Sequence, residues 1–119
     1  MNVEAAALLE SLYKMEPKVE VIDDVAHFFA GGLYIRRSII QPGGIVKMHV
    51  HEYDHLSIAL GVGVFVTEDG AINVMPGDCL EVKAGKRHSF VAKTTTIWFC
   101  IHPTSEAEAQ ELYGKELVH

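Results

Sequence analysis

The sequence has few cysteines and no long apolar run. Its 119 residues include only two cysteines, Cys79 and Cys100, so a framework of disulfide bonds is excluded and free thiols fit a reducing cytosol. The longest apolar run, residues 59–66, contains two glycines and is far too short to span a bilayer. The first residues lack the positive segment of a secretion signal, and Glu4 and Glu10 interrupt their apolar pattern. We therefore expect a cytoplasmic protein.

Positive charge is also scarce. Ten lysines and arginines stand against sixteen aspartates and glutamates, which gives a net charge of −6 with the histidines neutral. Such a chain has no general attraction to phosphate backbones or anionic lipid, so we expect neither nucleic acid nor a membrane surface as a partner. Hydrophobic residues make up 49% and charged residues 22% of the chain, a balance that fits one globular domain over residues 1–119.

Helical patterns occur only near the two ends of the sequence. Four apolar residues recur at helical spacing near the start: Ala5, Leu8, Leu9 and Leu12. They predict a helix over residues 3–14, which Pro17 prevents from continuing. A second helix is expected over about residues 105–117, because Ser105 can cap it and acidic residues occupy its first turn. Gly114 interrupts or ends that helix.

Residues 18–103 carry the signals of short strands. Segments rich in β-branched and aromatic residues alternate with turns that contain glycine or proline. The expected strands are residues 18–22, 25–30, 33–41, 45–51, 55–66, 71–75, 79–82, 88–92 and 95–102. No helical pattern lies between them, so the sequence predicts an all-β protein with a closed or sandwiched antiparallel sheet.

Histidines gather directly after the turn at residues 41–44. His49, His51 and His55 lie within seven residues, and His88 lies on a different predicted strand, just after another turn. Strand geometry places His49 and His51 on one face, about 7 Å apart along the backbone. Three or four neutral imidazoles with open coordination positions suit a divalent transition metal such as Fe, Mn, Ni or Zn.

The first histidine group resembles the first motif of the cupin family. That motif is a glycine, five residues, His-x-His, three or four residues, a glutamate, six residues and a glycine. Here Gly43 is followed by five residues, then by His49 and His51, and three residues later by His55. The position of the final motif glycine is Val62, which has a glycine on each side.

The segment around His88 is similar to the second cupin motif. That motif is a glycine, five residues, Pro-x-Gly, two residues, a histidine, three residues and an asparagine. Here Gly77 is followed by five residues, by Lys83-Ala84-Gly85 and, after two more residues, by His88. A lysine replaces the motif proline and Ala92 replaces the asparagine. The two glycine-anchored motifs stand in the family's order.

The resemblance implies a jelly-roll barrel (a double-stranded β-helix) with a metal near one mouth, and a homodimer. It also implies that His49, His51 and His88 are metal ligands. Position 55 is a glutamate ligand in the family but a histidine here, which makes a four-histidine site. Asp54 could instead replace the lost carboxylate, as a ligand or by holding a ligand histidine. Strand alternation favours His55.

For function, the resemblance implies a metal-dependent enzyme that acts on a small molecule. A non-haem dioxygenase is the leading form, and isomerase or lyase chemistry is the other. The candidate catalytic residues are Asp54, Glu52 and Tyr34. The alternative is a non-catalytic cupin that binds a small molecule or senses a metal, because no acid or base stands out beyond the ligands.

One question of side-chain direction stays open. Tyr34, Arg36 and Ser38 share one face of a predicted strand, and Ile35, Arg37 and Ile39 share the other. An arginine directed into the cavity would suit a carboxylate substrate. Two further histidines, His27 and His102, are expected to be ordinary strand histidines.

Overall fold

The computed structural model describes residues 2–14, 22–48, 54–114 and 117–118. The helices are α1 (Val3–Lys14) and α2 (Glu106–Tyr113). The strands are β1 (Ile22–Ala30), β2 (Leu33–Ile40), β3 (Ile45–Met48), β4 (His55–Leu60), β5 (Gly63–Thr67), β6 (Gly70–Val74), β7 (Asp78–Val82), β8 (His88–Ala92), β9 (Thr96–Pro103) and β10 (Leu117–Val118).

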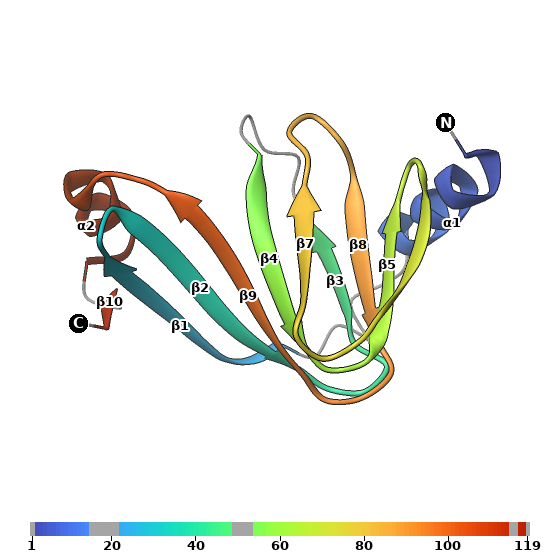
Figure 1. Cartoon of the computed structure of the whole chain (residues 1–119), viewed down its shortest axis with the longest axis horizontal. Helices are drawn as coiled ribbons and strands as arrows, with labels where there is room; N and C mark the ends of the chain where they lie inside the picture. The colour runs from blue at the N-terminus through green and yellow to red at the C-terminus, as the bar shows by residue number, and fades with distance from the viewer. Residues whose placement is uncertain (1, 15–21, 49–53, 115–116, 119) are drawn as a thin grey trace.

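The strands form two sheets, as Figure 1 shows. One has the order β10-β1-β2-β9-β4-β7 and the other the order β3-β8-β5-β6. Neighbouring strands are antiparallel except β1 and β10, which pair in parallel. Strands that are distant in sequence therefore lie side by side, as in a jelly roll. The prediction of an all-β jelly-roll fold with a helix near each end is confirmed.

The core lies between the two sheets and is built around three aromatic rings. Trp98 of β9 faces Phe90 of β8, with 4.7 Å between ring centroids, and Phe65 of β5, with 6.3 Å. All three side chains are fully buried. Burial of a side chain of this size contributes about 1.5–3 kcal/mol. These contacts join a strand of the six-stranded sheet to two strands of the four-stranded sheet.

Helix α1 covers the outer face of the four-stranded sheet. Its apolar stripe places Leu9 and Leu12 against Ile45 and Val66, and all four side chains are buried. The side-chain oxygen of Asn2 accepts a hydrogen bond from the Ala5 amide and caps the helix. Helix α1 occupies the residues for which the apolar spacing predicts a helix. Its role is to shield the sheet from solvent.

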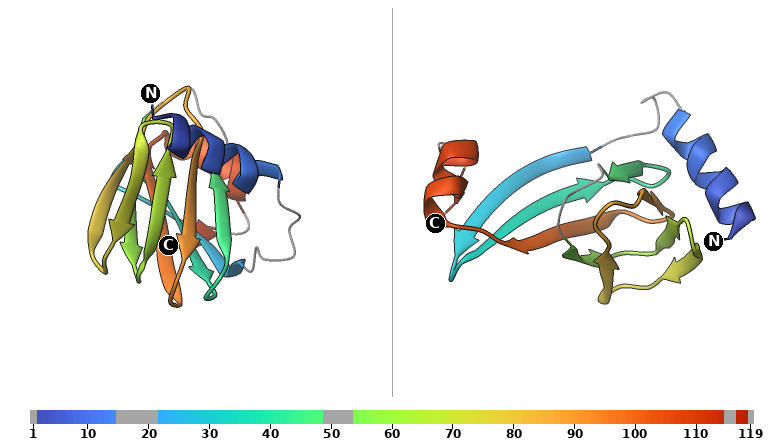
Figure 2. Two further views of the ribbon diagram at one scale, coloured as in Figure 1. Left: turned by 90° about the vertical axis from the view of Figure 1, so that its right-hand side faces the viewer. Right: turned by 90° about the horizontal axis from the view of Figure 1, so that it is seen from above.

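The six-stranded sheet extends beyond its partner sheet and carries α2 near its far end (Figure 2). Ser105 caps α2 by accepting a hydrogen bond from the Glu108 amide. The expectation that this helix reaches residue 117 is wrong, because α2 ends at Tyr113 and residues 117–118 form β10. Glycine has low helix propensity, so Gly114 ends the helix at little cost, and pairing with β1 satisfies the β10 backbone.

The single strand expected over residues 55–66 is two strands, β4 and β5, with a break at residues 61–62. A Cβ atom on Gly61 would lie 2.8 Å from the Cα of Thr96. One on Gly63 would lie 2.4 Å from the carbonyl oxygen of Val91. The two glycines that flank Val62 thus permit close approach of β9 and β8. The predicted strand residues 18–21 and 49–51 lie outside the described residues.

The face of β2 that turns inward is the one with Tyr34, Arg36 and Ser38. Tyr34 and Ser38 are buried, and Ser38 pairs across the sheet with the core residue Trp98. Arg37 turns outward, and its guanidinium carbon lies 5.6 Å from the centroid of the Phe28 ring. Of the two arginines, Arg36 is therefore the one on the inner face.

Within the part of the chain that the structure describes, no helix has the length and apolar composition needed to cross a bilayer.

Candidate metal centre

Two of the predicted ligand histidines lie at the same end of the β-sandwich. His55 begins β4 and pairs with Val82, the last residue of β7. The turn over residues 83–87 then leads to His88, the first residue of β8, in the opposite sheet. The start of β4 and this turn lie at the same end in Figure 1. The side chains of both histidines are buried, with 8% and 2% exposure.

The surroundings of His88 determine which of its ring nitrogens can bind a metal. Its Nδ1 lies 3.0 Å from the carbonyl oxygen of Lys86. A carbonyl oxygen only accepts, so Nδ1 carries the proton and the lone pair of the neutral ring is on Nε2. The His88 ring stacks on Phe65, with 5.6 Å between centroids. This arrangement fixes the tautomer and the orientation of the ring.

The protonation of His88 also favours metal binding. Burial lowers the pKa of His88 below its usual value of 6.5, and the hydrogen bond to the Lys86 carbonyl opposes this effect only in part. The neutral ring is therefore the dominant form at neutral pH. That is the form in which an imidazole binds a metal ion.

Asp54 and His55 have different surroundings, although they are adjacent. His55 is buried and shares the inner face of β4 with Ser57 and Ala59. Asp54 is exposed, and its Oδ1 accepts a hydrogen bond of 2.7 Å from the amide of Ala84. The carboxylate thus ties the start of β4 to the turn that precedes His88. Placement in the fold makes His55, rather than Asp54, the inward-facing group.

Charged contacts hold the same turn on its other side. Arg87 bonds Glu10 of α1 at 2.8 Å and lies 3.7 Å from Glu68. Lys86 bonds Asp69 at 3.2 Å. Exposed pairs of this kind contribute little stability individually. Together they fix the turn relative to α1 and to the loop between β5 and β6.

The other predicted residues of this site, His49, His51 and Glu52, lie outside the described residues. Their neighbours in sequence are described: Met48 pairs with His88, and Asp54 bonds the turn before His88. Among the described residues, no group of three or more His, Cys, Asp or Glu side chains could hold a metal ion. The described chain therefore places two of the four predicted ligands at one end of the sandwich.

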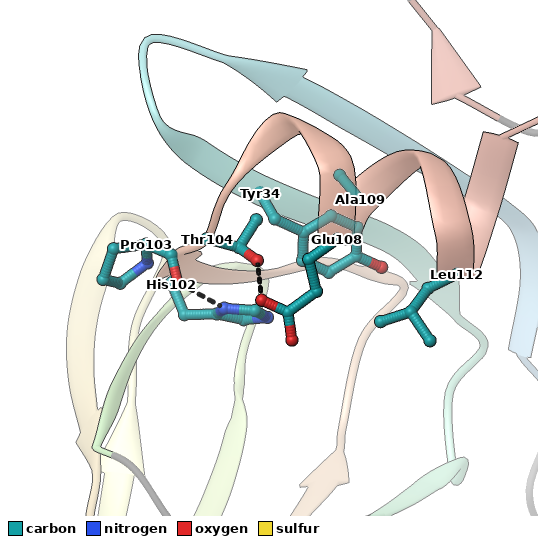
Figure 3. A pocket seen from close by; sticks show the side chains of 7 residues that line it. All are labelled: Tyr34, His102, Pro103, Thr104, Glu108, Ala109 and Leu112. Atoms are coloured by element: carbon teal, nitrogen blue, oxygen red, sulfur yellow. Dashed lines mark hydrogen bonds between the residues drawn. The ribbon is translucent and has the colours of Figure 1, made fainter.

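Tyr34, predicted as a catalytic candidate, lines a different cavity, which Figure 3 shows. This cavity, the α2 pocket, has a volume of about 180 Å³ and lies between β2, β9 and α2. Its lining residues are Tyr34, His102, Pro103, Thr104, Glu108, Ala109 and Leu112. The hydroxyl group of Tyr34 lies 2.6 Å from Nδ1 of His27, so His27 is a buried, hydrogen-bonded strand histidine. Sequence reasoning missed this pocket, because β9 and α2 are separated from β2 by about 60 residues of chain.

Comparison with known proteins matches the chain to a family and to several solved structures. The family model described as "Cupin domain" matches residues 36–102. Among solved structures, the chain is similar to ectoine synthase from P. lautus, with a TM-score of 0.60, 14% identity, and coverage of 89% of this chain and 83% of that one. It is also similar to a cupin superfamily protein from Desulfitobacterium hafniense, with a TM-score of 0.57, 21% identity, and coverage of 77% and 92%. No curated protein matches significantly. Structural similarity at these identities concerns the fold alone.

The hydrogen bond from Ala84 to Asp54 can be tested by mutation. Asp54→Ala removes the acceptor and should lower the free energy of unfolding by about 1 kcal/mol. Asp54→Asn keeps an accepting oxygen at the same position and should lower the free energy of unfolding by less than Asp54→Ala does. The measurement is urea unfolding in the presence of a chelator, so that bound metal makes no contribution. Equal stability of the alanine variant and the wild type would contradict a tie between the two segments.

Proposed function

Because the chain belongs to the cupin family, we propose that it is a metal-binding cupin whose metal centre acts on a small molecule. The proposed ligands are His49, His51, His55 and His88. The observation that carries the proposal is the state of His88: it is buried, its proton is held on Nδ1 by a carbonyl group, and its Nε2 bears the lone pair.

The donor chemistry fits a divalent transition metal, Fe, Mn, Ni or Zn. His55 and His88 come from opposite sheets and lie buried at one end of the sandwich. When bound, such an ion supplies a Lewis acid with coordination positions for substrate. Neutral imidazole ligands leave the full double positive charge at the ion, whereas the family's glutamate would remove one unit. Replacement of that glutamate by His55 therefore favours electron-rich or anionic substrates at this site.

The protein surroundings limit the chemistry that its own residues can perform. Phe65 stacks on the buried ring of His88, and burial lowers the pKa of His88, so this imidazole stays neutral at neutral pH. The carboxylate of Asp54 accepts a hydrogen bond from the Ala84 amide. This contact favours a role for Asp54 in holding the turn before His88, rather than in proton transfer. Glu52 remains our candidate for proton transfer. The leading reaction is dioxygenation of a small organic substrate, with isomerase or lyase chemistry as the other forms.

A non-catalytic cupin that binds a small molecule or senses a metal is the second candidate function. This second function is favoured because two of the candidate catalytic residues already make other contacts within the protein. Asp54 bonds a backbone amide, and Tyr34 lies in the α2 pocket with its hydroxyl group against His27. Such a binder would hold metal without turnover.

The free thiols of Cys79 and Cys100 support the reducing cytosol as the proposed location of either form.

Metal content tests the ligand set directly. We expect the wild type, purified without chelator and offered Fe, Mn, Ni and Zn, to bind about one ion per chain. His88→Ala and His49→Ala should lose most of the metal, as measured by elemental mass spectrometry. His55→Glu, which restores the family's ligand, should retain it. The control is His27→Ala, which removes a histidine bonded to Tyr34 and should leave metal content unchanged. A wild type that stays metal-free would refute the proposal.

Oxygen consumption separates the two candidate functions. The metal-loaded wild type is offered a panel of thiols, diols and phenols in an oxygen electrode. A dioxygenase should consume oxygen with at least one of them, and His88→Ala should reduce that rate by at least about 100-fold, because loss of a ligand removes the metal. A protein that holds metal but consumes no oxygen with any compound, and converts none of them, supports the non-catalytic form.

We also propose that two copies of the chain pair through the outer face of the six-stranded sheet. This surface, the outer apolar face, consists mainly of outward apolar side chains on β2, β9 and β4: Ile35, Ile39, Leu56, Ile58, Leu60, Ile97, Phe99 and Ile101. Its one charged member on these strands is Arg37, whose guanidinium group lies over the Phe28 ring. Helix α1 lies on the other sheet, and α2 lies against the inner residues Tyr34 and His102. Neither described helix therefore covers the outer apolar face.

The area of this face agrees with what a dimer requires. At strand spacings of about 4.8 Å and rises of about 3.3 Å per residue, the face with its flanking strands covers roughly 500 Å². Two such faces bury on the order of 1,000 Å², the lower bound for a specific interface. Leu56 and Leu60 are 41% and 43% exposed at its edge, so pairing would remove large apolar side chains from water.

Light scattering after size exclusion tests this pairing. The wild type should have twice the mass of one chain. The double variant Leu56→Glu/Leu60→Glu should have the mass of a single chain, because like charges would meet at the interface. Ile72→Glu places a charge on a more exposed apolar residue, on β6 of the other sheet, and should leave the dimer intact. A wild type with the mass of one chain would show that the outer apolar face does not pair.

A further inference from the structure

The α2 pocket has one aromatic wall and one wall provided by a helix. The rings of Tyr34 and His102 form the first, with 5.0 Å between their centroids and an angle of 53° between their planes. Glu108, Ala109 and Leu112 form the second, on one side of α2 (Figure 3). The pocket therefore combines aromatic surface, apolar surface and a carboxylate.

The polar groups of the aromatic wall form hydrogen bonds within the protein. The hydroxyl group of Tyr34 bonds His27, and Nδ1 of His102 donates to the carbonyl oxygen of Pro103 at 3.1 Å. Glu108 is different: its Oε2 accepts one hydrogen bond of 2.9 Å, from the hydroxyl group of Thr104. A carboxylate can accept about four hydrogen bonds, so most of its accepting capacity remains for a ligand.

The charge around the pocket is one-sided. Among the described residues, no lysine or arginine lines the pocket, and none of them forms an ion pair with Glu108. The whole chain carries a net charge of −6. A negatively charged group in such surroundings attracts cations and repels anions. The ligand that fits is therefore positively charged.

We propose that the α2 pocket binds a small alkylammonium ion. The ammonium group donates hydrogen bonds to Glu108 and lies against the rings of Tyr34 and His102, where the face of the tyrosine ring attracts a cation. The alkyl chain lies against Ala109 and Leu112; Leu112 is 63% exposed at the rim. A volume of about 180 Å³ accommodates an ammonium group with a short chain.

This inference is independent of the proposed metal centre. Neither His55 nor His88 lines the α2 pocket, and none of the described residues that line it is a proposed metal ligand. An ammonium ion can therefore bind with or without metal in the protein. Failure of one proposal leaves the other untouched.

An NMR titration of the full chain tests the proposal with three probes of equal length. Butylammonium should shift the backbone amide signals of Tyr34, His102, Thr104 and Glu108, with a dissociation constant in about the millimolar range. 1-Butanol, which has the same chain without the charge, should bind about threefold to tenfold more weakly. Butyrate should cause no shifts at these residues. Equal binding of butyrate would overturn the proposal.

Two variants and one control assign the contacts. Glu108→Gln keeps the size of the side chain and should weaken butylammonium binding about threefold to tenfold, to the level of butanol. Leu112→Ala should weaken butylammonium and butanol alike, because it removes apolar contact only. Glu111→Gln changes an exposed carboxylate on the same helix that does not line the pocket, and should have no effect. If Glu108→Gln binds butylammonium as well as the wild type does, the assignment is wrong.

Discussion

The packing of Trp98 against Phe65 and Phe90 holds the two sheets together, and the candidate metal centre depends on it. Phe65 contacts Trp98 on one side of its ring system and stacks on His88 as well. The core that fixes the distance between the sheets is thus continuous with a proposed ligand. A change in this packing would move His88 relative to His55, because the two histidines belong to opposite sheets.

Hydrogen bonds to backbone groups also hold the side chains of His88 and Asp54 in place. The carbonyl group of Lys86 sets the tautomer of His88, and the amide of Ala84 holds the carboxylate of Asp54. Both groups belong to one short turn between β7 and β8. That turn therefore connects the two segments that resemble cupin motifs. Local hydrogen bonds and the ion pairs of Arg87 hold this turn in position.

Much of the fold follows from local sequence signals, whereas the departures from the predicted elements arise from contacts between segments that are distant in the chain. Alternating β-prone segments predict the strands, and Gly114 marks the end of α2. The break between β4 and β5 was not predicted, because the need for Gly61 and Gly63 arises from strands that approach from elsewhere in the chain. The same holds for β10, whose two residues pair only because β1 is available beside them.

The sequence alone determined the family resemblance, because that resemblance depends on residue type and spacing; the four histidine ligands and a transition metal are predictions drawn from the same pattern. Tertiary structure decided the direction of each side chain. It turned His55 and Arg36 inward, turned Arg37 outward, and placed Tyr34 in a pocket with Glu108. Sequence spacing could not show these outcomes, since each depends on which strand or helix packs against which face.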